Sequence, residues 1–421
     1  MMALMLFCVC HAEDITIHFS GTTAKVKNSA KDSVKVKVKG ANVKIESQYK
    51  SHKLTLLLTG KSNDGQLMLK TAGKAKVKLE NLTLTSREGA PLWLKNKKNV
   101  EVVATKGTKN TLTITACKDT ANHKAATIWA KDKLLLSGKG TLNVIATGDG
   151  CRGIKSKKDI TIEELTLNVT TSGNHLGEKP FGFTGKHKYV ASTKGITSKG
   201  KVTIKSGVVT VRTSTPGAEG IEGRKGVVFN GGKVDVLAAD DAVNANATIE
   251  FNGAHVTVRS KGNDAVDANP EGGFFLPFGG GNNNKKIEPA IIIRGGTVYA
   301  WSQVGSPEEG LDCDMAPIAI EGGTVFSVGG SIGDAPSVPT NATAKQPTVL
   351  LVDLNVVKNE PITISDANGK CISTITIPFS MRRSASLVTC PAFKLGNTYT
   401  VKTKGYEKTF TLNEPFTTVR L

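Results

Sequence analysis

Acidic side chains recur at two fixed positions around a repeated apolar residue in the second half of the chain. The apolar residues are Ile221, Val243, Val266 and Leu311, and the positions are the second residue before each of them and the first residue after it. The acids and amides at or beside these positions are Glu219, Glu222, Asp240, Asp241, Asn244, Asn263, Asp264, Asp267, Glu309 and Asp312. Oxygen ligands of this kind suit Ca²⁺, which takes about six to eight of them.

Stacking would bring these carboxylates close together. If successive units pair like strands of a sheet, equivalent side chains lie about 4.8 Å apart. Two unit charges at that distance repel by about 3.5 kcal/mol at an effective dielectric constant near 20. The sequence therefore predicts bound calcium, and the alternative is a set of solvated turn residues, since Asp and Asn favour turns. The two preceding units have Arg152, Lys155, Lys194 and Thr197 at these positions, so no ion is expected there.

Basic and aromatic residues near the acidic positions are candidates for contacting a sugar. They are Arg224, Lys225, Arg259 and Lys261, with Phe274, Phe275 and Phe278 in a Gly- and Asn-rich segment. The aromatic segment either stacks on sugar rings or packs over the wall of the fold. An Arg or Lys that removes the C5 proton of a uronate, assisted by calcium, would make the protein a lyase, whereas the alternative is a solvated side chain. The stacked carboxylates leave inverting glycoside hydrolysis open as well.

Composition limits the remaining classes of function. The 421 residues include 55 Lys and Arg against 36 Asp and Glu, a net charge of +19, and the excess lies in residues 1–205, with 36 basic and 15 acidic residues. This excess predicts an anionic partner, or it serves solubility. The 7 His show no triad or metal spacing. With 5 Tyr, 3 Trp and no recognition module, nucleic-acid binding has only the basic half in its favour.

The first residues and the cysteines bear on the compartment. Residues 1–12 form a short apolar run that ends in small residues, which predicts a signal segment and a secreted or cell-surface protein. No run after residue 13 approaches the roughly 20 apolar residues of a transmembrane helix. Five cysteines follow residue 12, and none has zinc spacing. Cys371 and Cys390 flank one predicted hairpin and either pair or remain free thiols.

The elements that position these residues follow from a repeat. Ile154, Ile196, Ile221 and Val243 each have apolar residues 6, 8, 13 and 15 positions later. Each unit therefore contains one single apolar anchor and two alternating apolar pairs, separated by Gly-containing bends, which predicts three short strands. The anchors lie 22 to 25 residues apart between residues 196 and 266, which is too short for a βαβ unit. The prediction is an all-β parallel β-helix with three strands per coil over residues 13–335.

Three other regions depart from this repeat. Anchor spacings of 42 and 45 residues predict loop insertions near 175–191 and 269–288. The alternating segments 34–39 and 74–79 predict strands with one face of lysines, in earlier coils or in a cap. Residues 336–421 lose the Gly-rich repeat and are expected to form a small C-terminal β cap, with strands at 348–357, 361–364, 371–378 and 398–402.

The anchor segments also carry a resemblance to a known family. The segments are Arg152-Gly153-Ile154-Lys155-Ser156, Ala218-Glu219-Gly220-Ile221-Glu222, Asp240-Asp241-Ala242-Val243-Asn244 and Asn263-Asp264-Ala265-Val266-Asp267. In this order they resemble secreted bacterial carbohydrate-binding, polysaccharide-lyase-like β-helix proteins of the type common in Bacteroidetes. The resemblance implies a right-handed parallel β-helix, calcium on the Asp-rich turns, and binding of cellulose-like or acidic plant polysaccharides outside the cell. The lysine-rich first half departs from the acidic balance usual in that family.

Taken together, these features predict a secreted, calcium-binding protein that binds polysaccharide without catalysis. The alternatives are a calcium-dependent, pectate-type lyase and a structural surface adhesin in which calcium serves stability alone. The three hypotheses predict different behaviour toward a polyuronate. A binding protein retains it unchanged, a lyase cleaves it, and a structural adhesin neither binds nor cleaves it.

Overall fold

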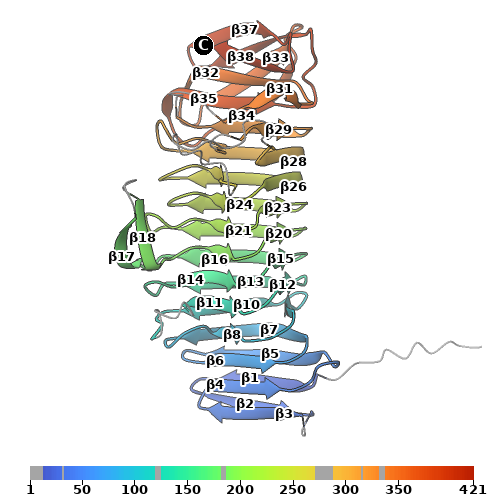
Figure 1. The fold of residues 1–421 in the computed structure, drawn as a ribbon, viewed down its shortest axis with the longest axis vertical. Helices are drawn as coiled ribbons and strands as arrows, with labels where there is room; N and C mark the ends of the chain where they lie inside the picture. The colour runs from blue at the N-terminus through green and yellow to red at the C-terminus, as the bar shows by residue number, and fades with distance from the viewer. Residues whose placement is uncertain are drawn as a thin grey trace, which may run out of the picture.

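The computed structural model describes residues 13–30, 33–118, 125–181, 186–270, 288–313, 316–330 and 337–421. Throughout these residues the regular elements are β-strands, which stack into a long column with the first strands at one end and the last at the other (Figure 1). Within the described ranges, no helix has the length and apolar character needed to cross a membrane. The predicted signal segment, residues 1–12, lies outside the described residues.

Most strands belong to two large sheets. Sheet B has 10 strands, and sheet A has 22. Sheet B consists of β3 (Val34–Lys39), β4 (Asn42–Ser47), β6 (Gln66–Thr71), β8 (Leu92–Leu94), β11 (Ala126–Ala130), β14 (Arg152–Ser156), β19 (Ile196–Ser198), β22 (Ile221–Gly223), β25 (Val243–Ala245) and β27 (Val266–Ala268). The repeating part of sheet A consists of β5 (Leu54–Ser62), β7 (Ala75–Ser86), β9 (Val100–Ala104), β10 (Lys109–Ile114), β12 (Leu134–Ser137), β13 (Thr141–Ala146), β15 (Ile160–Ile162), β16 (Thr166–Thr171), β20 (Val202–Ile204), β21 (Val208–Thr213), β23 (Val227–Phe229), β24 (Lys233–Ala238), β26 (Ile249–Ser260), β28 (Ile291–Ser302), β29 (Ile318–Ile320) and β30 (Thr324–Val328).

The register of the stacked units is the one that the repeat predicts. In sheet B, Ile154 pairs in parallel with Ile196, Ile196 with Ile221, Ile221 with Val243, and Val243 with Val266. These anchors are fully buried. Apolar side chains at equal offsets therefore stack on one another, because each unit contributes one strand to sheet B and its following segments to sheet A.

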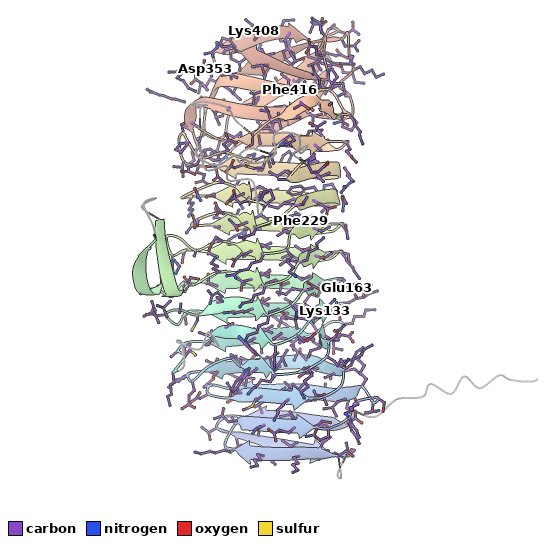
Figure 2. The ribbon with its side chains drawn as sticks, viewed as in Figure 1. Lys133, Glu163, Phe229, Asp353, Lys408 and Phe416 are labelled. Atoms are coloured by element: carbon purple, nitrogen blue, oxygen red, sulfur yellow. The ribbon has the colours of Figure 1, made fainter. Side chains whose placement is uncertain are left out.

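One continuous apolar core fills the space that the two sheets enclose. Phe229, at mid-height in Figure 2, stacks on Phe251 of the next unit with ring centroids 4.9 Å apart, and both side chains are fully buried. The bends between the two segments of sheet A bring backbone against backbone. At Gly232, where φ is +82°, a Cβ atom would lie 2.5 Å from the carbonyl oxygen of Gly207 in the unit before, so only glycine fits.

The fold class expected from the sequence, a right-handed parallel β-helix with three strands per coil, is wrong. The strands form two large sheets instead of three, and in β7, β26 and β28 the two sheet A segments of a unit are one continuous strand. The Gly-containing bend does not interrupt the pairing: β26 pairs with β28 along almost its whole length, with register shifts only around Asn252. The molecule is an all-β, barrel-like column in which sheets A and B surround one core.

The first strands close one end of the column with antiparallel pairs. β1 (Ile15–Ser20) pairs with β2 (Thr23–Asn28) in sheet A, and β3 pairs with β4 in sheet B. The alternating segment 34–39 is thus an edge strand, while segment 74–79 lies in β7 within the parallel stack. The predicted insertion near 175–191 contains a two-stranded antiparallel hairpin, β17 (Leu176–Phe181) and β18 (Lys186–Ala191), which projects from the column (Figure 1). Most of the second insertion, including Phe274, Phe275 and Phe278, lies outside the described residues.

The last strands form a region at the other end in which many pairs are antiparallel. They are β31 (Pro339–Ala344), β32 (Thr348–Val356), β33 (Pro361–Asp366), β34 (Cys371–Thr376), β35 (Met381–Thr389), β36 (Thr398–Thr403), β37 (Tyr406–Thr411) and β38 (Phe416–Arg420). However, β32 pairs with β38 in parallel, and β31, β32, β35 and β38 continue sheet A. β33, β34, β36 and β37 make a four-stranded sheet with its own apolar core, which packs against Trp301 and Phe326 of the column. Cys371 and Cys390 are both free thiols, so the pairing left open by the sequence does not occur.

Candidate functional site on the outer face of sheet B

The charged positions around the anchors form two rows on the outside of sheet B. We call the residues directly after the anchors the strand row: Lys155, Thr197, Glu222, Asn244, Asp267 and Asp312. Each pairs in register with the next, the last through a single bridge between Asp267 and Asp312. The residues two positions before the anchors form the turn row: Arg152, Lys194, Glu219, Asp241, Asp264 and Glu309. The rows are basic in the earlier units and acidic in the later ones.

Lys194 sits where the basic and acidic units meet. Its ammonium group donates hydrogen bonds to Glu219 Oε1 and, at 3.2 Å, to Glu222 Oε2. Burial opposes the charge of Lys194, but the two glutamates raise its pKa above the ordinary value. Burial acts against the charged form of Glu222 as well and so raises its pKa. The charge of Lys194 and its hydrogen bond more than offset this effect, and the net pKa of Glu222 is lowered. These two glutamates, expected as metal ligands, thus already have a counter-charge from the protein.

Asp241 and Asp267 are joined by the side-chain amide of Asn244. Asn244 donates through Nδ2 to Asp241 Oδ2 at 3.1 Å and to Asp267 Oδ2 at 2.7 Å. The other carboxylate oxygen of Asp241 is buried and has no hydrogen-bond partner, and the residue is only 4% exposed. Burial, followed by repulsion from Asp267, raises the pKa of Asp241 well above its usual range. Burial, followed by repulsion from Asp312, likewise raises the pKa of Asp264 to about 9.

The last acidic unit is tied to the loop that precedes β31. Ser337 donates its hydroxyl to Asp312 Oδ1 at 3.0 Å and its backbone N–H to Glu309 Oε2 at 3.2 Å. Asp240 and Asn263, in the turns beside these rows, are partly exposed, and their backbone carbonyls accept hydrogen bonds from Ser260 and Ser302. The ten predicted ligands therefore lie along one face but are spread over four units.

The chemistry of these groups fits a cation only in part. Within the described ranges, no three His, Cys, Asp or Glu side chains converge closely enough to hold a metal ion. The set that comes nearest is Asp241, Asn244 and Asp267, which offers hard oxygens and one buried oxygen that lacks a partner. To ligate Ca²⁺, Asn244 would turn its amide so that the oxygen faces the two carboxylates. The remaining positions around the ion would belong to water or to a bound ligand.

The sugar-contacting residues expected from the sequence do not lie together. Arg224 and Lys225 are exposed in the turn after β22, with Arg224 3.9 Å from Glu222. Arg259 lies on the outer face of sheet A, where it donates to Asp235 Oδ1 at 2.7 Å, and Lys261 is exposed in the turn that follows. Because Arg259 is already paired on a different face, it does not belong to this site.

Sequence reasoning missed the residues at the basic end of the strand row. Trp93 and Trp129 occupy the same outward position as Lys155 in the two preceding units, and the pairing runs Trp93, Trp129, Lys155. The alternation in Leu92-Trp93-Leu94 and the anchor Ile128 were the signals that could have placed both indoles on this face. Burial, and then repulsion from Arg152 and Lys199, lowers the pKa of Lys155 to about 7.

Arg152 completes the basic end of the face. Its Nη2 donates to Ser192 Oγ at 2.7 Å, while Nη1 is buried without a hydrogen-bond partner. Burial is the main cause of the lowered pKa of Arg152. The base of the β17–β18 hairpin lies nearby, fixed by His175, whose ring nitrogens lie 2.8 Å from the carbonyl oxygen of Pro216 and 3.0 Å from the N–H of Thr193. The turn row therefore contains a guanidinium group, that of Arg152, and a carboxylate, that of Asp241, which each have one buried atom without a hydrogen-bond partner.

Comparison with known proteins identifies a family for the chain. Residues 39–179 and 183–265, more than half of the chain, match the family model described as carbohydrate-binding domain-containing protein. These residues include the strands of sheet B from β4 to β25. No curated protein and no solved structure matches the chain. On the family match, the chain belongs to the carbohydrate-binding domain-containing proteins.

Proposed function

We propose that the protein is secreted, that it binds an anionic polysaccharide on the outer face of sheet B with the help of Ca²⁺, and that it does not cleave the glycan. Carbohydrate binding follows from the family. The nature of the glycan and the role of calcium are inferred from the face itself.

One observation carries this proposal. Three buried polar atoms in the turn row, Arg152 Nη1, Glu219 Oε2 and Asp241 Oδ1, have no hydrogen-bond partner. A buried polar group without a partner costs roughly 1–3 kcal/mol and calls for an explanation such as a missing ligand. A glycan that carries carboxylates satisfies the guanidinium at one end of the line, and a cation satisfies the carboxylate at the other.

Calcium would be held by Asp241, Asn244 and Asp267 in this proposal. Two carboxylates and one amide oxygen leave about half of the usual coordination positions open. Oxygens of a bound uronate can fill some of them, so that the ion links protein and glycan.

The test is isothermal titration of the full chain with polygalacturonate and with cellohexaose, each with Ca²⁺ and with a chelator. We expect binding of polygalacturonate that weakens roughly tenfold or more on chelation, as for the loss of one good charged contact. Asp241→Asn should remove the calcium dependence, and the matched control Glu407→Gln, exposed in the C-terminal region, should keep it. Equal binding of both glycans irrespective of calcium would contradict the proposal.

A second candidate, a calcium-dependent lyase, is favoured by Lys155. A lysine with its pKa lowered to about 7 is partly neutral at physiological pH, as a group that removes a proton must be. Ultraviolet absorbance recorded during the same titration decides between the two, since β-elimination produces an absorbing unsaturated uronate. Growing absorbance that is lost in Lys155→Met would make the protein an enzyme. A protein that neither retains nor cleaves polygalacturonate would leave the structural adhesin as the remaining hypothesis.

A further inference from the structure

A third row on sheet B is basic in five successive units. The residue that directly follows each sheet B strand from β8 to β22 is Lys95, Lys131, Lys157, Lys199 and Arg224 in turn. We call this set the basic row. The backbone N–H of each of the last four donates to a carbonyl at the end of the strand before, as in Lys131 to Leu94 at 2.9 Å and Lys157 to Ala130 at 3.0 Å. The five residues are therefore stacked in register along the column.

Three members of the basic row, Lys131, Lys157 and Lys199, have no acidic partner among the residues that the structure describes. Lys131, Lys157, Lys199 and Arg224 are exposed. In the part of the chain that the structure describes, no ion pair involves Lys131, Lys157 or Lys199. Neighbouring unit charges at a strand spacing of about 4.8 Å repel by roughly 0.9 kcal/mol even at the dielectric constant of water. The row changes to Asn246 and Asn269 in the two units that follow Arg224, so the positive charge is confined to one stretch of the face.

Aromatic side chains lie along the inner side of this row. The ammonium group of Lys95 lies 4.7 Å from the ring centre of Trp93, and that of Lys157 lies 5.7 Å from the ring centre of Trp129. Trp93 is half-buried and Trp129 is buried, and the two form a small apolar cluster outside the main core. An indole beside a cation is a combination that can contact the apolar face of a sugar ring and its acidic substituent together.

We propose that an extended anionic polysaccharide lies along the basic row, across the strands and parallel to the long axis of the column, with one carboxylate per unit. This inference rests on the proposed function and specifies its ligand as a polyuronate. An extended glycan advances by about one strand spacing per sugar, so its carboxylates can follow Lys131, Lys157 and Lys199 in turn. Trp93 then lies beside a sugar ring at the end of this stretch.

The experiment compares two triple variants with equal loss of charge. One carries Lys131→Gln, Lys157→Gln and Lys199→Gln, and the matched control carries Lys358→Gln, Lys394→Gln and Lys408→Gln, three exposed lysines of the C-terminal region (Lys408 in Figure 2). Binding of polygalacturonate is measured by titration at two salt concentrations. We expect the first triple to bind about tenfold or more weakly and with a smaller salt dependence, as for three surface charge contacts, and the control to bind like the unchanged protein.

The outcomes separate this inference from the proposed function. If the unchanged protein binds polygalacturonate and both triples bind it equally well, the basic row is not the site, although the proposed function stands. If the unchanged protein does not bind polygalacturonate at all, the proposed function fails and this inference fails with it. Single-stranded DNA of similar length is the second probe: binding as tight as that of polygalacturonate, lost in the same triple, would make the row a general polyanion site and overturn the assignment to a glycan.

Discussion

The half-buried Lys155 makes glycan binding depend on pH in a way that can be worked out. Its pKa of about 7 results first from burial and then from Arg152 and Lys199, with Lys157 adding to the effect and Glu222 opposing it. A uronate bound beside Lys155 favours the charged form and raises this pKa. Above pH 7, binding must therefore be accompanied by uptake of a proton.

The size of the effect follows from this linkage. A charged hydrogen bond to the carboxylate contributes about 1.5–3 kcal/mol, which corresponds to a factor of roughly 10 to 150 between protonated and neutral Lys155. When the bound form keeps its proton, affinity falls by up to tenfold for each pH unit above 7. We therefore expect the dissociation constant for polygalacturonate to rise about tenfold between pH 6 and pH 8. The uronates remain ionised throughout, because their own pKa lies far below this range.

The assay is titration of the unchanged protein and of two variants across this pH range. Lys155→Met should bind more weakly at pH 6 and show no further loss by pH 8. Lys155→Arg should keep its charge and its affinity at both values. Burial is the main cause of the lowered pKa of His175, so its titration is shifted away from that of Lys155.

The titration of Lys155 does not destabilise the fold as the pH rises. The folded pKa of Lys155 lies below its ordinary value of 10.5, so between pH 7 and that value the unfolded chain holds more protons than the folded one. Stability from this residue therefore rises with pH across the window in which binding is lost. A tenfold loss of affinity that persists in Lys155→Met would refute the assignment of the effect to this side chain.

Three further predictions concern the core, the stacking and the acidic units. Phe251→Ala should lower the free energy of unfolding by about 3–5 kcal/mol in denaturant titration, because it opens a cavity against Phe229, and a loss below 1 kcal/mol would show that the core collapses around it. Gly220→Ala should lower the free energy of unfolding by about 1–3 kcal/mol, since the added Cβ would lie 2.6 Å from a backbone oxygen of the next unit. The control Gly305→Ala, with open space around the added Cβ, should leave the free energy of unfolding nearly unchanged. Equal effects of the two substitutions would count against tight stacking of the units. Asp241→Asn should raise the melting temperature in chelator, because it removes buried like-charge repulsion, and a lower melting temperature would mean that the carboxylate stabilises the protein by itself.

The repeat allowed the stacking to be predicted from the sequence. Side chains alternate with period two in a strand, and the units have nearly equal length, so apolar residues at constant offsets must meet in neighbouring units. Ile196, Ile221 and Val243 pair as this argument requires. The same spacing located the hairpin near 175–191, because extra residues between two stacked anchors must leave the column.

The number of sheets could not be obtained in this way. The sequence pattern of apolar pairs on either side of a glycine is the same whether the bend separates two sheets or only changes the direction of one continuous strand. In β26 the hydrogen bonding continues past Asn252 and Gly253 with a local shift of register, so two expected strands are one. Backbone pairing across such a bend depends on the neighbouring unit, which the local sequence does not specify.

The site shows the same division between sequence and structure. The sequence by itself determined that acidic residues gather at two positions and that basic residues precede them, since this needs only the offsets. Tertiary structure alone decided that Lys194 neutralises Glu219 and Glu222, that Asp241 retains a buried oxygen without a partner, and that Trp93, Trp129 and Lys155 share one outward row. The reason is physical: the charge state and availability of a side chain depend on its burial and on contacts with residues 20 or more positions away, which exist only once the units have stacked.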